Sequence, residues 1–213
     1  MSRERKCEIM IAIIDYGAGN VKSVMFALRR IGVEGHLTTD AAGLREAAGI
    51  ILPGVGAFGR AMERLGEEEL DETLRELSRD GKPLLGICLG HQLLFSESGE
   101  HGRHSGLGLI RGEVRRFGDG VKTPHMGWNR IRYRKPSALF EGIGDESFFY
   151  FAHSFTVCPI EEGVTLAVTD YGAEFASAVQ HGNVYGVQFH PEKSGEAGRA
   201  VLVNFCRICM GEK

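Results

Sequence analysis

The chain has 213 residues, 43% of them hydrophobic and 25% charged, which is the composition of an ordinary globular protein with a core of ample size. Its formal net charge is −3 and it contains no long basic run, so nucleic acid is not an expected partner. No apolar run approaches the roughly 18 residues of a membrane span, and the charged N-terminus lacks the pattern of a signal peptide. We expect a short flexible leader over residues 1–8, followed by one domain over residues 9–213.

The five cysteines are an odd number and too few for a disulfide scaffold in a chain of this length. They favour a reducing, cytoplasmic setting. Cys206 and Cys209 have the spacing of a metal or redox pair, but they fall in a helical pattern without a second pair of ligands. We therefore expect no metal site and no cofactor.

The first half of the chain alternates strand-like and helix-like segments. Residues 9–15 form a continuous apolar run, typical of a strand buried on both faces in a parallel sheet. The segments predicted after it are a helix over 21–31, strands over 35–39 and 49–53, a long amphipathic helix over 58–79, a strand over 83–87 and a helix over 89–95. This alternation predicts an α/β fold with a mostly parallel, doubly wound sheet.

After residue 105 the pattern changes to strand-like segments joined by short turns. They cover 109–117, 129–133, 147–158, 165–168, 175–181 and 184–190, and a helix over 195–210 follows them. We expect these strands to be antiparallel and appended to the parallel sheet. Gly17 and Gly19 follow the first strand, but Lys22 replaces the third glycine of a dinucleotide fingerprint, so NAD binding is not expected.

The sequence Gly86-Ile87-Cys88-Leu89-Gly90 has the pattern of a nucleophile elbow with sulfur in place of oxygen. A nucleophile on a tight strand-to-helix turn needs small neighbours two residues away on each side, and two glycines supply them. The following helix would direct its N–H groups and positive dipole end towards the sulfur, which favours the thiolate. A buried structural cysteine at the end of a core strand explains the same residues equally well.

A thiol nucleophile needs a base, and the base needs an orienting group. His190 ends an apolar strand, where open α/β sheets place their active sites, and Glu192 follows two residues later. The carboxylate would hydrogen-bond the far ring nitrogen of His190 and fix its tautomer. An exposed histidine at a strand end is the alternative, but its pairing with an elbow cysteine favours a catalytic role.

Acyl transfer also needs an oxyanion hole. Gly54, Val55 and Gly56 follow the strand over 49–53, which we expect to lie beside the elbow strand. Backbone flanked by glycine is able to present an N–H group to an oxyanion, with the Leu89 N–H as the second donor. In a chain with 30 glycines an ordinary glycine loop is the alternative.

Six short blocks carry a resemblance to a known family. Residues 53–58, 86–92 and 189–194 resemble the class I (triad) glutamine amidotransferases. Within that family, further matches at residues 14–20, 124–129 and 150–155 make the chain most similar to the glutaminase subunits of imidazole glycerol phosphate synthase, from histidine biosynthesis. One departure is His91, where this subunit more often carries Met and where amidotransferases of carbamoyl phosphate or nucleotide synthesis typically carry His.

The resemblance implies a mechanism. Cys88 attacks the side-chain amide of glutamine, His190 protonates the departing ammonia and then activates water, and Glu192 orients His190. The N–H groups of Val55 and Leu89 hold the oxyanion, once the Val55 peptide has reoriented. The residues implied to hold glutamine are Gln92, Glu100, Ser154 and Phe155.

The resemblance also implies a partner. Ammonia would pass to a separate TIM-barrel cyclase, which makes imidazole glycerol phosphate and an aminoimidazole carboxamide ribotide. The residues implied at that interface are Asn20, His125, Trp128, Tyr150 and Lys193.

Two other functions remain open from the residues alone. A class I glutaminase of another pathway, such as anthranilate, pyridoxal phosphate or nucleotide synthesis, explains the triad equally well but not Trp128 and its neighbours. A catalytically silent binding module of the same fold would be expected to lose Cys88, His190 or Glu192, and all three are present.

Overall fold

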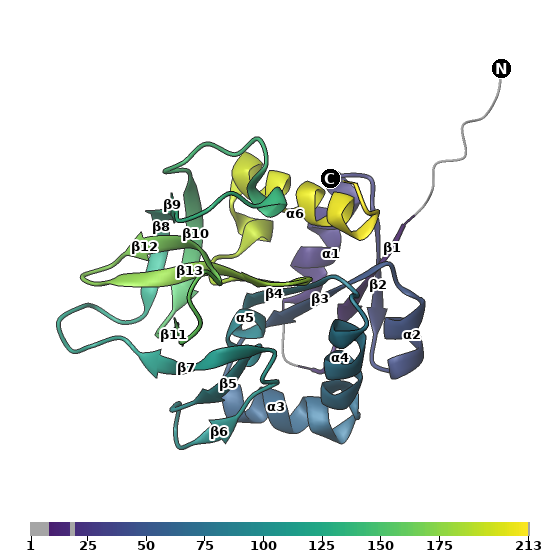
Figure 1. The fold of residues 1–213 in the computed structure, drawn as a ribbon, viewed down its shortest axis with the longest axis horizontal. Coiled ribbons are helices and arrows are strands. Elements are labelled where there is room, and N and C mark those ends of the chain that lie inside the picture. The colour runs from purple at the N-terminus through teal and green to yellow at the C-terminus, as the bar shows by residue number, and fades with distance from the viewer. Residues whose placement is uncertain (1–8, 18–19, 213) are drawn as a thin grey trace.

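The computed structural model describes residues 9–17 and 20–212, which form an α/β fold (Figure 1). The predicted leader and residues 18–19 of the first loop lie outside the described residues. Five parallel strands build one side of the main sheet in the order β2-β1-β3-β4-β14, with β2 at the edge. Their bounds are β1 (Met10–Ile14), β2 (Glu34–Thr38), β3 (Gly49–Gly54), β4 (Leu84–Cys88) and β14 (Val184–Val187). The predicted neighbourhood of the 49–53 strand and the elbow strand is confirmed.

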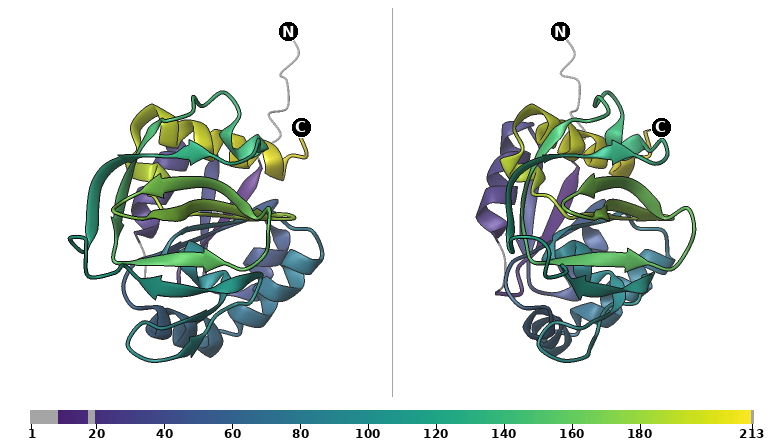
Figure 2. Two further views of the ribbon diagram at one scale, coloured as in Figure 1. Left: turned by 60° about the vertical axis from the view of Figure 1, so that its left-hand side comes forward. Right: turned by 90° about the vertical axis from the view of Figure 1, so that its left-hand side faces the viewer.

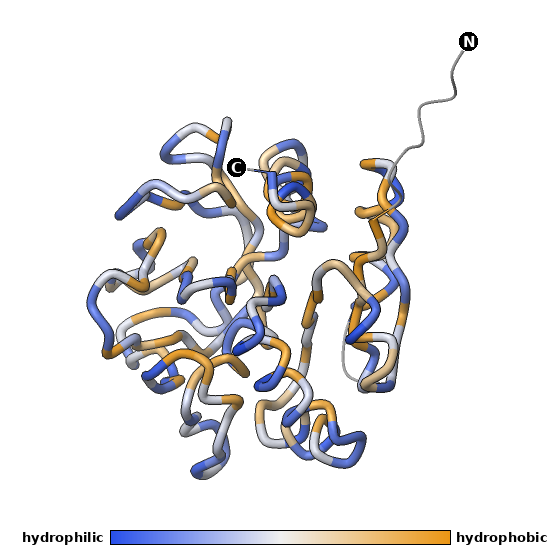
Figure 3. The backbone as a smooth tube through the Cα atoms, turned by 45° about the vertical axis from the view of Figure 1, so that its right-hand side comes forward, coloured by the Kyte–Doolittle hydropathy of each residue, from blue (hydrophilic) through white to orange (hydrophobic). Residues whose placement is uncertain are grey.

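Helices cover both faces of these parallel strands, because successive side chains of a strand point to opposite faces. Ile11 and Ile13 belong to one apolar cluster with side chains of α1 (Val21–Arg30) and α6 (Gly195–Cys209). Ala12 and Ile14 belong to a second cluster, with α2 (Ala41–Glu46), α3 (Phe58–Glu67), α4 (Leu70–Arg79) and α5 (Leu89–Leu93). In Figure 3 orange, hydrophobic stretches run along the strands and helices that pack together. The predicted doubly wound sheet is confirmed.

The second half of the chain extends the sheet with antiparallel strands, which lie on the left of Figure 1 and face the viewer in the right-hand view of Figure 2. Beyond β14 the order continues β13-β11-β7-β5-β6, and β12 and β9 branch from β13. β8 and β10 form a separate antiparallel pair. The bounds are β5 (Phe95–Ser98), β6 (His104–Ser105), β7 (Ile110–Arg116), β8 (His125–Arg130), β9 (Arg132–Tyr133), β10 (Phe148–His153), β11 (Phe155–Pro159), β12 (Thr165–Asp170) and β13 (Glu174–His181). The predicted appended antiparallel strands are confirmed, although β5 pairs with β7 in parallel.

The single helix predicted over residues 58–79 is wrong, because the segment contains two helices. Glu69 has a left-handed backbone, with φ at 54°, and it separates α3 from α4. Gly66 is a poor helix former near the end of α3, and it is followed by three consecutive glutamates. Asp71 and Glu72 lie in the first turn of α4, where the helix dipole favours negative charge. The helical spacing of the apolar residues continues across the break, so this spacing did not reveal it. The acidic residues of the first turn stabilise the start of α4 instead.

Three other predicted boundaries are also wrong. The helix after the elbow ends at Leu93, and Phe95 begins β5. The strand predicted over 129–133 begins at His125, and the one over 147–158 is interrupted at Ser154. The short elements α2, β5 and β6 were not predicted, and 3-10 turns occupy Ala138–Phe140 and Pro191–Lys193. Among the described residues, none of the helices is long and apolar enough to cross a membrane.

Candidate active site

Cys88 lies on a sharp turn between β4 and α5, as the elbow pattern predicts. Its backbone has φ at 55° and ψ at −108°, and α5 begins at the next residue. A residue other than glycine with positive φ costs of the order of 1–3 kcal/mol, so the surrounding structure must hold it. β4 is buried and paired in parallel with β3 and β14, which supplies that support.

The glycines beside Cys88 are required by close backbone packing. A Cβ on Gly86 would lie 2.6 Å from the Gly90 carbonyl oxygen. A Cβ on Gly90 would overlap the Leu52 carbonyl oxygen in β3. The first turn of α5 therefore packs directly on two strands, and only glycine fits at these positions. The physical reason given for both glycines is confirmed.

The strand predicted over 184–190 ends at Val187, so His190 lies in the turn after β14 and does not end a strand. Its Nδ1 lies 2.8 Å from Oε1 of Glu192. The turn that carries these two residues is hydrogen-bonded to β10. The His190 N–H donates to the Tyr150 carbonyl oxygen at 2.9 Å, and the Ser194 hydroxyl donates to the His190 carbonyl oxygen at 2.6 Å. The side chain of Glu192 is only 1% exposed, so its carboxylate is held in a nearly dry position.

The charge state of His190 is set by its two neighbours. Burial lowers its pKa, but hydrogen bonding with Cys88 and Glu192 raises it more, to about 10. This raised pKa favours the imidazolium form at neutral pH, with the Glu192 carboxylate against Nδ1 of the ring. This arrangement matches the predicted set of nucleophile, base and orienting group. It also makes His190 a proton donor in the resting state.

The residues predicted for the oxyanion hole lie beside the sulfur. Gly54 is paired with Cys88 in the register of β3 and β4, and Leu89 is the first residue of α5. Val55 and Gly56 line the cavity into which Cys88 opens. Val55 is 43% exposed, and Gly56 has φ at 98°, a conformation that favours glycine.

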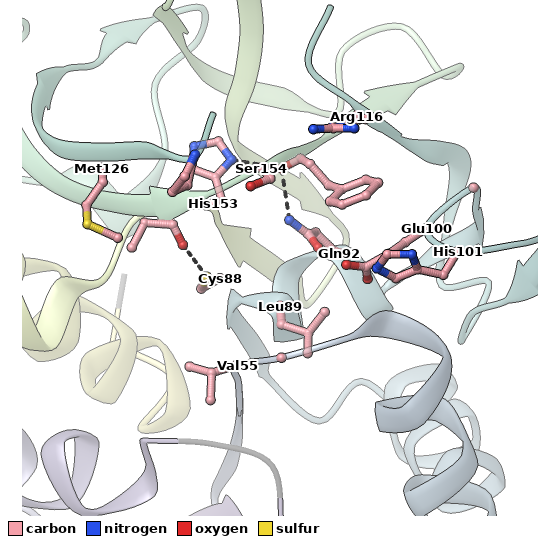
Figure 4. A pocket seen from close by; sticks show the side chains of 15 residues that line it. Val55, Cys88, Leu89, Gln92, Glu100, His101, Arg116, Met126, His153 and Ser154 are labelled. Atoms are coloured by element: carbon pink, nitrogen blue, oxygen red, sulfur yellow. Dashed lines mark hydrogen bonds between the residues drawn. The ribbon is translucent and has the colours of Figure 1, made fainter. Parts of the chain in front are cut away.

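A cavity of about 650 Å³ adjoins Cys88 (Figure 4). All four residues predicted to hold glutamine, Gln92, Glu100, Ser154 and Phe155, line it. The Gln92 amide donates to the Phe155 carbonyl oxygen and to Oε1 of Gln188, both at 3.0 Å. Oε2 of Glu100 accepts a hydrogen bond of 2.6 Å from the Phe58 N–H at the start of α3. These contacts fix the walls of the cavity.

Two further residues of the site were not predicted. Gln188 is fully buried, and its amide donates to the Cys88 sulfur at 3.9 Å. Arg116, at the end of β7, brings a positive charge to the cavity wall. Strand alternation from His190 could have indicated Gln188, but nothing local indicates Arg116. The cavity is also lined by Gly99, His101, Pro124, Met126, Ala152 and His153.

Three of the residues predicted at a partner interface form one row. Trp128 and Tyr150 are paired across β8 and β10, with ring centroids 6.2 Å apart. The Lys193 ammonium lies 5.7 Å from the centroid of the Tyr150 ring. Trp128 is 56% exposed, and Met126 and Phe148 beside it are also exposed. Asn20 lies at the start of α1, where its side-chain oxygen accepts a hydrogen bond from Ser23.

His125 lies on the opposite face of β8 and is buried. Its ring stacks between Phe151 and Tyr171, and its Nδ1 is 3.0 Å from Nε2 of His153. Burial lowers the pKa of His125 to about 4 and that of His153 to about 3. His125 is therefore a neutral packing residue beneath the exposed row, not part of the exposed surface.

His91 in α5 has no exposed surface and packs edge-on against Phe95. Neither ring nitrogen has a hydrogen-bond partner within the described part of the chain. Burial, assisted by His153, lowers the pKa of His91 to about 3. A buried polar group without a partner destabilises the fold by about 1–3 kcal/mol.

The variant His91→Met should therefore raise the free energy of unfolding by about 1–3 kcal/mol at pH 7, since Met fills a similar volume without polar atoms. The folded pKa lies below the unfolded value, so the stability that depends on neutral His91 is complete above pH 6.5 and is lost as the pH falls. At pH 5 the advantage of Met should grow by about 2 kcal/mol.

Chemical denaturation at both pH values measures this, with exposed His36→Met as control. Equal stability of His91→Met and wild type would contradict the expectation.

The comparisons with known proteins agree with this geometry. The family model described as Glutamine amidotransferase class-I matches residues 12–209. An imidazole glycerol phosphate synthase subunit HisH of Moorella thermoacetica is 53% identical over 195 residues, which cover 92% of this chain and 93% of that protein. The HisH of Geobacillus kaustophilus is 49% identical over 208 residues, covering 95% and 98%.

Solved structures share the fold at low sequence identity. PurLQS from Thermotoga maritima has a TM-score of 0.75 at 20% identity, covering 94% of this chain and 99% of that one. A glutamine amidotransferase from Thermotoga maritima has a TM-score of 0.66 at 14% identity, covering 95% and 98%. The chain belongs to the class I glutamine amidotransferase family, and among the proteins of that family it is similar to the HisH subunits of imidazole glycerol phosphate synthase.

Proposed function

We propose that this chain hydrolyses glutamine to glutamate and ammonia and delivers the ammonia to a TIM-barrel cyclase subunit in histidine biosynthesis. The observation that carries the proposal is geometric: Cys88 opens into the cavity at the carboxyl end of β4, and the His190–Glu192 pair, joined at 2.8 Å, follows the neighbouring parallel strand β14. Residues 9–213 would act as one amidotransferase domain. The four described cysteines are free thiols, which supports a cytoplasmic site of action.

The proposed reaction uses each member of the triad in turn. The Cys88 thiolate attacks the side-chain amide carbon of glutamine, and the developing oxyanion accepts hydrogen bonds from the N–H groups of Val55 and Leu89. His190 gives its proton to the departing nitrogen, so ammonia leaves and a thioester remains. Neutral His190 then takes a proton from water, which attacks the thioester. Glutamate is released, and the thiolate and imidazolium are restored.

The cavity suits an α-amino acid substrate. Glu100 supplies a carboxylate for the ammonium group, and Arg116 supplies a guanidinium for the carboxylate. Gln92 donates both amide hydrogens within the protein, so its amide oxygen remains as an acceptor. Ser154 and Phe155 offer backbone groups between these charges. Gln188, which donates to the sulfur, would help to keep the thiolate in place.

The exposed row of Trp128, Tyr150 and Lys193 lies beside the cavity and is proposed to contact the cyclase. Met126 supports this, since it lines the cavity and is also exposed next to Trp128 on the same face of β8. An aromatic residue exposed on a strand is a typical anchor of an interface. Asn20 would contact the cyclase at the start of α1. His125 would act from beneath the row, because it is buried.

The isolated chain should hydrolyse glutamine weakly, and the cyclase with its ligand bound should activate it about 10²-fold, which is the effect of completing one oxyanion donor. The assay mixes the purified chain with the purified TIM-barrel cyclase subunit of imidazole glycerol phosphate synthase, named HisF, and its ligand. It measures glutamate and imidazole glycerol phosphate. The control supplies the cyclase with ammonium salt in place of glutamine, which should bypass this chain.

Full-speed hydrolysis by the isolated chain would contradict the proposed dependence on a partner. Glutamate formation that HisF neither accelerates nor couples to imidazole glycerol phosphate would favour a glutaminase of another pathway. Absence of hydrolysis under every condition would favour a silent binding module.

A further inference from the structure

Tyr16 is a buried residue in the loop after β1, two residues past its last residue, and its hydroxyl reaches β3. It donates a hydrogen bond of 2.9 Å to the carbonyl oxygen of Pro53, the residue before the predicted oxyanion loop. Burial raises the pKa of Tyr16, and the nearby Cys88 adds to the shift. The hydroxyl is therefore a neutral donor throughout the working pH range. It is packed so closely that a Cβ on Gly54 would lie 2.6 Å from it.

The oxyanion loop, defined here as Gly54 to Ala57, is held at both ends by side chains from distant segments. Tyr16 holds the carbonyl group just before it, and Glu100 accepts from the Phe58 N–H just after it. Between these two contacts, Val55, Gly56 and Ala57 are exposed to solvent. Any rotation of the loop peptides is therefore confined to the residues between the two contacts.

The peptide that Tyr16 holds directly precedes the one proposed to act in catalysis. The Pro53 carbonyl belongs to the peptide that joins Pro53 to Gly54, and the next peptide carries the Val55 N–H. Where the first plane is fixed, the second turns only through the torsions of Gly54 and Val55. We propose that Tyr16 is a positioning residue, whose hydroxyl anchors the Pro53 carbonyl so that the Val55 N–H aligns with the oxyanion. This inference rests on the proposed glutaminase function.

The test is Tyr16→Phe, which keeps the buried ring and removes only the hydroxyl. Loss of a single hydrogen bond of this kind should lower the fraction of molecules whose Val55 N–H faces the oxyanion by about two- to ten-fold. The kcat for glutamine hydrolysis should therefore fall by that factor. KM should stay within about two-fold, because the glutamine-binding contacts are unchanged. Alkylation of Cys88 by iodoacetamide should also stay within about two-fold of wild type, because that displacement develops no oxyanion.

The matched control is Tyr133→Phe. Its hydroxyl donates to the Ile143 carbonyl oxygen at 3.1 Å, and Tyr133 does not line the cavity. The same chemical group is lost there, so both variants should lose similar stability in thermal unfolding. Only Tyr16→Phe should lose kcat. All variants are assayed in complex with the HisF cyclase and its ligand.

A kcat of Tyr16→Phe equal to that of Tyr133→Phe would overturn the inference, and so would a parallel fall of hydrolysis and alkylation. A selective fall of kcat, with alkylation intact, supports it. If the wild-type complex does not hydrolyse glutamine although its Cys88 is alkylated, the proposed function itself fails, and the role of Tyr16 fails with it.

Discussion

Replacing Cys88 by alanine is expected to lower glutamine hydrolysis by at least about 10³-fold, with the fold intact. Cys88 is the one cysteine lining the cavity in the described part of the chain, so no other thiol is placed to form the thioester. Alanine fits the buried site, because it removes the sulfur and leaves the backbone contacts of the elbow unchanged. Water alone would then have to attack the amide.

The measurement is glutamate release, together with glutamine binding and thermal unfolding. Binding should persist, since Gln92 and Glu100 are untouched. The control is Cys209→Ala in α6, whose thiol packs against Gly49, at the end of β3 opposite Gly54. It should retain activity within about two-fold. Hydrolysis at an undiminished rate in Cys88→Ala would rule out the thiol mechanism.

The elbow could be predicted from sequence because its requirements are local. Glycine is required at positions 86 and 90 because one helical turn packs closely against the strand ends beside it. Both positions lie within two residues of Cys88. The pairing of β3 and β14 with β4 then follows from the parallel arrangement that the alternating pattern predicts. Residues at the carboxyl ends of those strands, including His190, come together as a consequence.

The rest of the cavity could not be predicted, because it depends on which distant strands become neighbours. Arg116 reaches the cavity only because β7 pairs with β11, with Arg116 opposite Phe155. The interruption at Ser154 was missed for the same reason. β10 pairs with β8 while β11 joins the main sheet, and the apolar pattern is continuous across this change of partner. The resemblance to a family supplied Glu100, Ser154 and Phe155 where the local pattern did not.

The nucleophile with its base and the oxyanion loop differ in how firmly the resting structure holds them. In the proposed triad, Glu192 already holds His190 at 2.8 Å in the isolated chain, and Cys88 is fixed on the elbow between β4 and α5. The oxyanion loop is the exposed part of the site, and it lies close to the cavity residues that continue into the proposed interface. A partner that acts on the loop would therefore change the rate without rebuilding the nucleophile.

The second large effect is expected from Glu192→Gln, which should lower kcat about 10³-fold with KM little changed. The carboxylate oxygen Oε1 accepts from Nδ1 of His190, and the side chain is nearly fully buried. Its second oxygen has no hydrogen-bond partner among the described residues, so His190 is the contact that compensates for burying the charge. A glutamine there is able to turn its NH₂ group towards Nδ1, which would place the imidazole proton on the wrong nitrogen.

The same substitution should change the pH dependence. Hydrogen bonding with Cys88 and Glu192 raises the pKa of His190 against the effect of burial, so loss of the carboxylate should lower that pKa. The alkaline limit of kcat/KM should then move to lower pH. The control is Glu76→Gln, which breaks an exposed bidentate pair with Arg45 and should leave activity unchanged. Wild-type kcat and an unshifted alkaline limit in Glu192→Gln would mean that the backbone ties to β10 orient His190 without help from the carboxylate.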